Sequence, residues 1–205
     1  MRSDKYDNVR KNLLPGDIIA FGGRGLMSEA IKAYTRCSVS HVGIVMQTGF
    51  IEGEPIVLVC ESTSLGDGFA GVQISRLSVR VATYDGEMWW LPLNPVVREE
   101  LDVIGLQVFL ARQVGKEYDA IQAIGSALDK LVPDNREDMS KLFCSELCTA
   151  AFEDNLGDTQ FVHKDPDFIW TFKNINASEQ TPLDVVRFPI YGEVVQLKGD
   201  PLPMY

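Results

Sequence analysis

The sequence predicts an α+β domain in which a largely antiparallel sheet precedes a group of helices. Short apolar runs separated by turn residues fill the first half of the chain, a pattern typical of strands. Apolar residues at helical spacing fill most of the second half. Strands followed by helices, without regular alternation, favour an α+β arrangement over a parallel α/β sheet.

The strands follow from the apolar runs and the turn residues between them. Leu14-Pro15-Gly16-Asp17 is turn chemistry, and Ser28 is a suitable N-cap for a helix to about Arg36. The two runs on either side of the segment from Thr48 to Pro55 predict an antiparallel hairpin with a rather long loop. Trp89 and Trp90 lie in the last run, so one ring is expected in the core and the other partly exposed. Strands are predicted at 18–21, 41–47, 56–61, 71–74 and 87–93.

The helices follow from apolar residues at three- and four-residue spacing. A helix from Glu99 to Val114 should end at Gly115, and Ser140 is a plausible N-cap for the last helix. The tail is rich in proline, and Val185-Val186-Arg187-Phe188 predicts one edge strand. Helices are predicted at 99–114, 118–131 and 140–154.

Composition narrows the class of function. The formal charge of −10 argues against a nucleic-acid partner, because phosphate binding needs a basic face. No stretch approaches the roughly 20 apolar residues of a membrane span, and the N-terminus lacks the apolar core of a signal peptide. The expectation is a cytoplasmic protein. The length of 205 residues suits one domain, with two small ones as the less favoured option.

The predicted hairpin brings a histidine and a glutamate together. If residue 47 pairs with residue 55, His41 lies directly opposite Glu61, with Cβ atoms about 4.5–5.5 Å apart. Side chains alternate along a strand, so both would point to the same face. A one-residue slip would place Glu61 on the other face. A carboxylate beside an imidazole fixes its tautomer and stabilises its protonated form.

Cys144 is the candidate nucleophile that such a pair would serve. With Ser140 as the N-cap, Cys144 falls in the first turn of a helix or just beyond it. Backbone N–H groups and the helix dipole favour an anion there, which lowers the pKa of a thiol. A thiolate near His41 could attack a carbonyl carbon, and the free N–H groups could stabilise the oxyanion.

Simpler interpretations compete with this one. An isolated histidine at a strand start is more often structural, and an isolated helical cysteine more often packs in a core. His163 is the competing base, since the chain has only two histidines. Cys144 and Cys148, one helical turn apart, could bind a metal ion with His163 or His41. The four cysteines form no Cys-x-x-Cys pair, so zinc-ribbon spacing is absent, and no metal or cofactor is predicted.

The motifs, taken in order, resemble a known family. They are Leu-Pro-Gly-Asp-Ile-Ile near the start, Ser40-His41-Val42-Gly43-Ile44-Val45, Cys60-Glu61-Ser62, Gly115-x-x-Tyr118-Asp119 and Phe143-Cys144-Ser145-Glu146-Leu147. This order is similar to that of the circularly permuted branch of the NlpC-type, papain-like cysteine peptidases. Within that branch the YiiX-like proteins are most similar, and lecithin retinol acyltransferase is more distant. The resemblance covers about residues 14–155, leaving 160–205 as a C-terminal extension packed on that core.

The resemblance implies a papain-like core, with an antiparallel sheet or small barrel packed against the helix that carries the cysteine. By position it makes Cys144 the nucleophile, His41 the base and Glu61 the orienting group, and it places Tyr118 near the substrate. It implies catalysis through an acyl-enzyme on Cys144. The resemblance does not fix the substrate, and we expect a peptide-like amide, including cell-wall or modified peptides. Acyl transfer to or from a lipid is the alternative enzyme activity, and an inactive binding module is the non-enzyme alternative.

Overall fold

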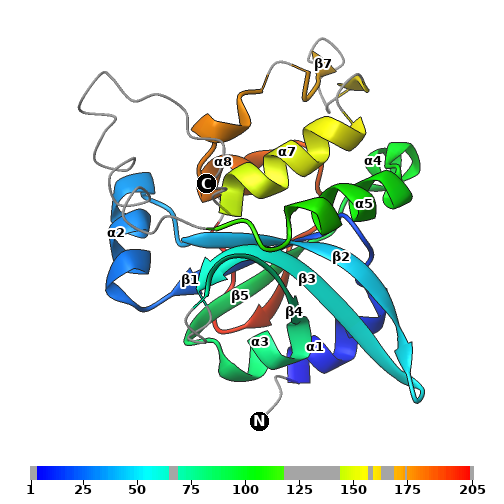
Figure 1. Cartoon of the computed structure of the whole chain (residues 1–205). Coiled ribbons are helices and arrows are strands. Elements are labelled where there is room, and N and C mark those ends of the chain that lie inside the picture. The colour runs from blue at the N-terminus through cyan, green and yellow to red at the C-terminus, as the bar shows by residue number, and fades with distance from the viewer. Residues whose placement is uncertain are drawn as a thin grey trace.

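A computed structural model describes residues 4–64, 69–117, 144–156, 159–162, 169–173 and 175–203. Its centre is a six-stranded sheet in which every pair of neighbours is antiparallel. Helices cover both faces of this sheet (Figure 1). The mixed α+β class and the antiparallel sheet expected from the sequence are therefore confirmed.

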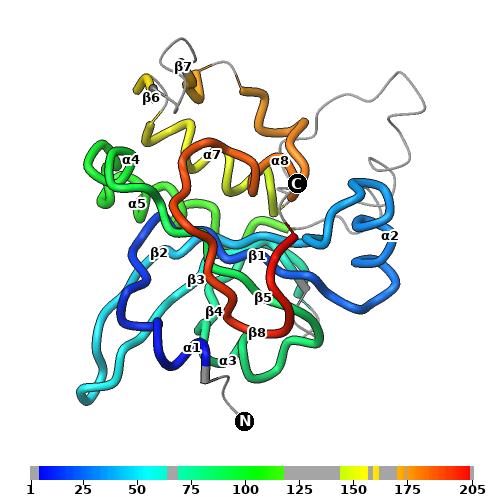
Figure 2. Tube along the Cα trace, turned by 180° about the vertical axis from the view of Figure 1, so that it is seen from behind, coloured from blue at the N-terminus to red at the C-terminus, as the bar shows by residue number. Residues whose placement is uncertain are grey.

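The sheet has the strand order β4-β3-β2-β1-β5-β8, so β1 and β2 are central. Strand β8 comes from the C-terminal tail and runs beside β5 (Figure 2). The C-terminal tail therefore supplies an edge strand of the sheet, in addition to packing on the core. The strands are β1 Ile18–Gly23, β2 His41–Ile51, β3 Glu54–Ser64, β4 Ala70–Arg76, β5 Gly86–Leu91 and β8 Val195–Lys198, with a small separate pair, β6 Phe161–Val162 and β7 Ile169–Trp170.

Successive side chains along the strands point to opposite faces of the sheet and pack into two separate hydrophobic cores. In β1, Ile18 and Ala20 pack toward α5, α7 and α8, whereas Ile19 and Phe21 pack toward α1 and α3. Figure 1 shows these two groups of helices on opposite faces of the sheet. The partial exposure predicted for one tryptophan is wrong for this reason. Trp89 is buried in one core and Trp90 in the other.

The helix predicted over 99–114 is two helices. Helix α4 ends at Glu100, Leu101 is extended, and the Asp102 side chain accepts hydrogen bonds from the N–H groups at the start of α5. An N-cap inside the periodic run therefore breaks it. The helices are α1 Asp4–Val9, α2 Leu26–Thr35, α3 Leu77–Thr83, α4 Pro95–Glu100, α5 Val103–Gln113, α7 Cys144–Leu156 and α8 Pro182–Arg187, with short 3-10 turns η1 Arg10–Asn12 and η2 Ala177–Glu179.

The edge strand predicted at 185–188 is wrong, because that segment belongs to α8. Thr181 and Asp184 form a reciprocal capping box, and Pro182 occupies the first helical turn. The capping box and the proline favour a helix at this position more strongly than the β-branched residues of 185–188 favour a strand. The C-terminal edge strand lies later in the chain, at Val195–Lys198.

The β2–β3 hairpin is longer and tighter than its sequence predicts. The strands continue to a two-residue turn at Glu52 and Gly53, both with positive φ, as in type I′ hairpins. The register then shifts by one residue at Met46, which forms a β-bulge. The long loop and the uniform register predicted from the apolar runs are both wrong. Beyond the bulge Ile44 pairs with Cys60.

Candidate active site

His41 is the first residue of β2, at the end of the strand where its side chain can reach beyond the sheet. It pairs with Phe21 of β1, and the two rings lie 5.1 Å apart. Its Nε2 atom lies 2.9 Å from Oε2 of Glu61. The imidazole is 15% exposed and the carboxylate is fully buried, so this contact is shielded from water. Because Nε2 is engaged by Glu61, Nδ1 is the ring nitrogen of His41 that remains available for another side chain.

Glu61 reaches His41 diagonally, and the direct opposition predicted from the sequence is wrong. Continuing the pairing of Ile44 with Cys60 by one residue places Glu61 opposite Gly43. A Cβ atom built on Gly43 would lie 3.2 Å from that of Glu61. Residues 41 and 43 share a face of the strand, so Glu61 and His41 still point to the same side. The prediction that they share a face holds, although the register differs by two residues.

Cys144 meets His41 from the opposite layer of the fold. It is the first residue of α7, which packs on β2 and β3. Its thiol is hydrogen-bonded to the His41 side chain, and the backbone N–H groups of Val42 and Ser145 also donate to the sulfur. The three side chains singled out from the sequence therefore form one chain of contacts, from Cys144 through His41 to Glu61.

The electrostatics favour a thiolate and an imidazolium. Burial alone would lower the pKa of His41, but Cys144 and Glu61 together raise it to about 9. Burial alone would raise the pKa of Cys144. The charge of His41 and the hydrogen bonds donated to the sulfur outweigh burial and lower the pKa of Cys144 below the ordinary value. Both shifts point the same way, because each ionised partner stabilises the other.

Glu61 is held by more partners than the sequence indicates. The Ser75 hydroxyl on β4 donates to Oε1, and Arg80 Nη2 on α3 donates to Oε2 at 3.1 Å. Arg80 Nε lies 2.9 Å from Oε1 as an ion pair, although its N–H is not aimed at that oxygen. Burial alone would raise the pKa of Glu61, yet His41, Arg80 and Ser75 bring it below its usual value. The carboxylate is therefore ionised.

Neither Arg80 nor Ser75 was identified from the sequence, since the segment 62–87 carries no recognisable motif. The available signal was the spacing of Leu77, Arg80 and Val81, which places an arginine on the apolar face of a short helix. All three are buried. A buried arginine requires an anionic partner, and Glu61 provides it.

The other cysteines differ from Cys144 in environment. Cys37, Cys60 and Cys148 are buried, whereas Cys144 is partly exposed. Burial raises the pKa of Cys60 to about 12, and it raises the pKa of Cys148 well above the ordinary value. Cys148 packs in the core beneath α7. The described part of the chain holds no group of three or more side chains arranged to bind a metal ion.

Three residues with a specific role predicted from the sequence lie outside the described ranges. They are Tyr118, the candidate substrate-binding residue, His163, the competing base, and Ser140, the expected N-cap. The helix predicted over 118–131 also lies outside them. Their roles stay predictions.

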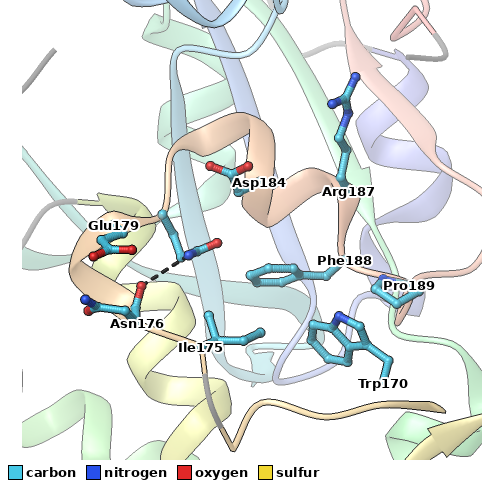
Figure 3. Close-up of a pocket in the computed structure, with 9 residues that line it drawn as sticks. Trp170, Ile175, Asn176, Glu179, Asp184, Arg187, Phe188 and Pro189 are labelled. Atoms are coloured by element: carbon cyan, nitrogen blue, oxygen red, sulfur yellow. Dashed lines mark hydrogen bonds between the residues drawn. The ribbon is translucent and has the colours of Figure 1, made fainter. Parts of the chain in front are cut away.

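A groove of about 450 Å³ opens between α8 and the segment that precedes it (Figure 3). The rings of Trp170 and Phe188 lie 5.3 Å apart at one end, and the carboxylates of Glu179 and Asp184 lie at the other. None of the three site residues lines it. The groove is linked to the helix that carries Cys144 by a hydrogen bond. The Ser145 hydroxyl, in the first turn of α7, donates to the main-chain carbonyl of Gln180 in the groove wall at 2.7 Å.

The fold and the site define an α+β protein with a buried Glu–His pair and a cysteine at a helix start. No family model and no curated protein sequence matches the chain. Among solved structures, the crystal structure of metalloprotein yiiX from Escherichia coli O157:H7 aligns over 89% of this chain and 88% of that chain, at 18% identity and a TM-score of 0.43. No helix within the described ranges is long and apolar enough to cross a membrane. Placement among permuted papain-like enzymes stays a prediction.

Proposed function

We propose that this protein is a cysteine hydrolase of the permuted papain-like type that cleaves a peptide-like amide through an acyl-enzyme on Cys144. The observation that carries the proposal is the continuous contact of thiol, imidazole and carboxylate, in which the pKa of Cys144 is lowered and that of His41 is raised. A nucleophile, a base and a group that orients the base are the three parts that thiol catalysis needs.

Acylation uses the preformed ion pair. The Cys144 thiolate attacks the carbonyl carbon of the substrate, and a sulfur–carbon bond forms as the carbonyl oxygen becomes an oxyanion. When the tetrahedral intermediate collapses, the carbon–nitrogen bond breaks and the imidazolium of His41 gives its proton to the departing amine. The products of this step are a thioester on Cys144, a free amine and a neutral His41.

Deacylation runs the same proton transfer in reverse. Neutral His41 takes a proton from a water molecule, which attacks the thioester carbon. The carbon–sulfur bond breaks, the carboxylic acid product leaves, and thiolate and imidazolium are restored. The Nε2 contact with Glu61 holds the imidazole in one orientation through both steps, so Nδ1 stays directed at the reacting atoms.

Peptide-like amides fit the described surface better than lipid acyl chains. Exposed apolar surface around Trp89, Trp90 or Phe69 would favour a lipid substrate, but both tryptophan rings are buried and Phe69 is half-buried. The groove tied to Ser145 combines aromatic rings with the charged side chains of Glu179, Asp184 and Arg187. Such a mixed lining suits the polar backbone and varied side chains of a peptide.

The decisive experiment measures the rate of iodoacetamide labelling at each cysteine by mass spectrometry from pH 5 to pH 9. Cys144 should label fastest at pH 6–7, well below the ordinary thiol pKa of about 8.5. His41→Ala should abolish that advantage. Cys148 is the internal control, since it lies one turn further along the same helix with its pKa raised.

Equal labelling of all four cysteines in the wild type would exclude a nucleophilic Cys144 and would favour the inactive binding module. Rapid labelling that survives His41→Ala would mean that the helix start alone activates the thiol. In the expected case, peptide amides and lipid esters are then compared as substrates, with Cys144→Ala as the inactive control. Turnover of lipid esters alone would replace the amidase assignment.

A further inference from the structure

Arg80 contacts both oxygens of the Glu61 carboxylate, and it shares one of them with His41. It comes from α3, beyond β4, and touches both carboxylate oxygens: Nη2 donates to Oε2 at 3.1 Å and Nε lies 2.9 Å from Oε1. Oε2 therefore receives hydrogen bonds from Arg80 and from His41. Ser75 completes the shell by donating to Oε1. Glu61 is fully buried, so these protein groups replace the water that would otherwise solvate it.

The guanidinium of Arg80 is fixed by aromatic rings. It lies 5.2 Å from the ring centre of Phe21 and 5.1 Å from that of Tyr84. These rings pack edge to face at 5.0 Å, and Phe21 also contacts the imidazole of His41. A cation over aromatic faces is stabilised by the ring quadrupole, and a guanidinium held this way loses little further freedom on pairing. Phe21 thus contacts both of the cations that flank Glu61.

The charges alternate along the site: thiolate, imidazolium, carboxylate, guanidinium. Without Arg80 the buried group would hold two anions and one cation, and an unbalanced buried charge is strongly unfavourable. When His41 gives its proton to a leaving group, Cys144 is acylated and uncharged, so the site without Arg80 would still carry one net negative charge, and Glu61 would then face no cation at all. A buried carboxylate in that state tends to take up a proton itself.

We propose that Arg80 is a positioning residue that keeps Glu61 ionised throughout turnover, so that His41 alone carries the transferred proton. This inference rests on the function proposed above and extends the site from three side chains to four. Arg80 acts through Glu61, since its described contacts are with Glu61 and the two rings. Glu61 also acts on the pKa values of three other described residues, Cys60, Cys148 and Tyr84. These groups are neutral, because burial raises their pKa values.

The test compares the pH profile of Cys144 labelling in Arg80→Met with that of Arg76→Met. Arg76 is exposed at the N-cap of the same helix, so its replacement removes the same formal charge away from the site. Loss of Arg80 should raise the pKa of Glu61 and weaken its support of the imidazolium, and the acid limb of the Cys144 profile should move upward by about one pH unit. At pH 6 this is a loss of about tenfold in labelling rate, since one pKa unit is a factor of ten. The Arg80→Met and wild-type rates should converge near pH 8.

A purely structural role would lower labelling equally at every pH, and that outcome would overturn the inference. Arg80→Lys keeps the charge and should recover most of the acid limb. In a Glu61→Gln background, Arg80→Met should shift the profile little further, because the two residues act as one unit. If wild-type Cys144 shows no lowered pKa, the proposed function itself fails. A low wild-type pKa that Arg80→Met leaves unchanged refutes the role of Arg80 alone.

Discussion

Gly43 lies opposite Glu61 across the β2–β3 pair, and the missing side chain at this position leaves room for the carboxylate to reach His41. A Cβ atom on Gly43 would lie 2.7 Å from Cγ1 of Val59 and 3.2 Å from Cβ of Glu61. Contacts that short require the neighbours to move. The glycine is therefore part of the geometry that joins the histidine to its carboxylate.

Gly43→Ala should consequently disturb the site more than it disturbs the fold. We expect labelling of Cys144 at pH 6–7 to fall at least several-fold, because the added methyl group displaces Glu61 from Nε2 of His41. Gly49→Ala is the matched control, since it lies on the same strand and its added Cβ would meet nothing within 4 Å. Equal labelling rates in the two variants would contradict this account.

The stability contribution of Glu61 should depend on pH. Its pKa is lower in the folded chain than the ordinary 4.5, so its contribution is fully present above pH 4.5 and is lost as the pH falls through the folded value. Glu61→Gln should lower the free energy of unfolding by about 3 kcal/mol at pH 7, since it leaves Arg80 buried without a counter-charge. The difference from wild type should shrink as the pH falls from 4.5 to 3.

Urea denaturation at several pH values measures this difference directly. Glu54→Gln serves as the control, because Glu54 lies at the other end of β3 in an exposed pair with Arg10. That exposed pair should contribute little to stability, because water screens its charges. A difference between wild type and Glu61→Gln that stays constant down to pH 3 would show that Glu61 is not ionised in the folded protein.

Asp17 should be a stability residue without influence on the site. Its carboxylate is fully buried and accepts hydrogen bonds from the backbone of Leu14 and Leu93, the indole of Trp90 and the guanidinium of Arg98. An asparagine would turn an NH₂ group toward some of these donors. Asp17→Asn should cost about 3 kcal/mol of unfolding free energy and leave the Cys144 pH profile unchanged. A shifted profile would mean that the turn before β1 also positions the site.

The side chain of Ser145 should link α7 to the groove without acting on the thiol. Its hydroxyl donates to the carbonyl of Gln180, whereas its backbone N–H, which Ser145→Ala keeps, faces the sulfur. Ser145→Ala should lower stability by about 1 kcal/mol and raise the KM for a peptide substrate, with the labelling profile preserved. Ser178→Ala, on the exposed surface of η2, is the control. A change in the labelling profile would place Ser145 within the reacting group.

Much of the fold was predictable because its signals are local. Period-two alternation indicates strands, three- and four-residue spacing indicates helices, and the described elements follow most of these runs. Competing local signals explain two failures: the Asp102 cap divides the helix predicted over 99–114, and the capping box at Thr181 and Asp184 makes 182–187 a helix. The strand Val195–Lys198 was missed because a short edge strand has little periodicity.

The sequence by itself determined which side chains could perform the chemistry: His41 at a strand start, Glu61 at the end of a run and Cys144 near a helix start. Tertiary structure decided how they meet. The tight turn at Glu52 and Gly53 alone would set a register that points Glu61 away from His41, and the bulge at Met46 restores the shared face. Arg80 joins Glu61 from a helix nineteen residues further on. Register and buried charge balance depend on packing between distant segments, and no local periodicity encodes them.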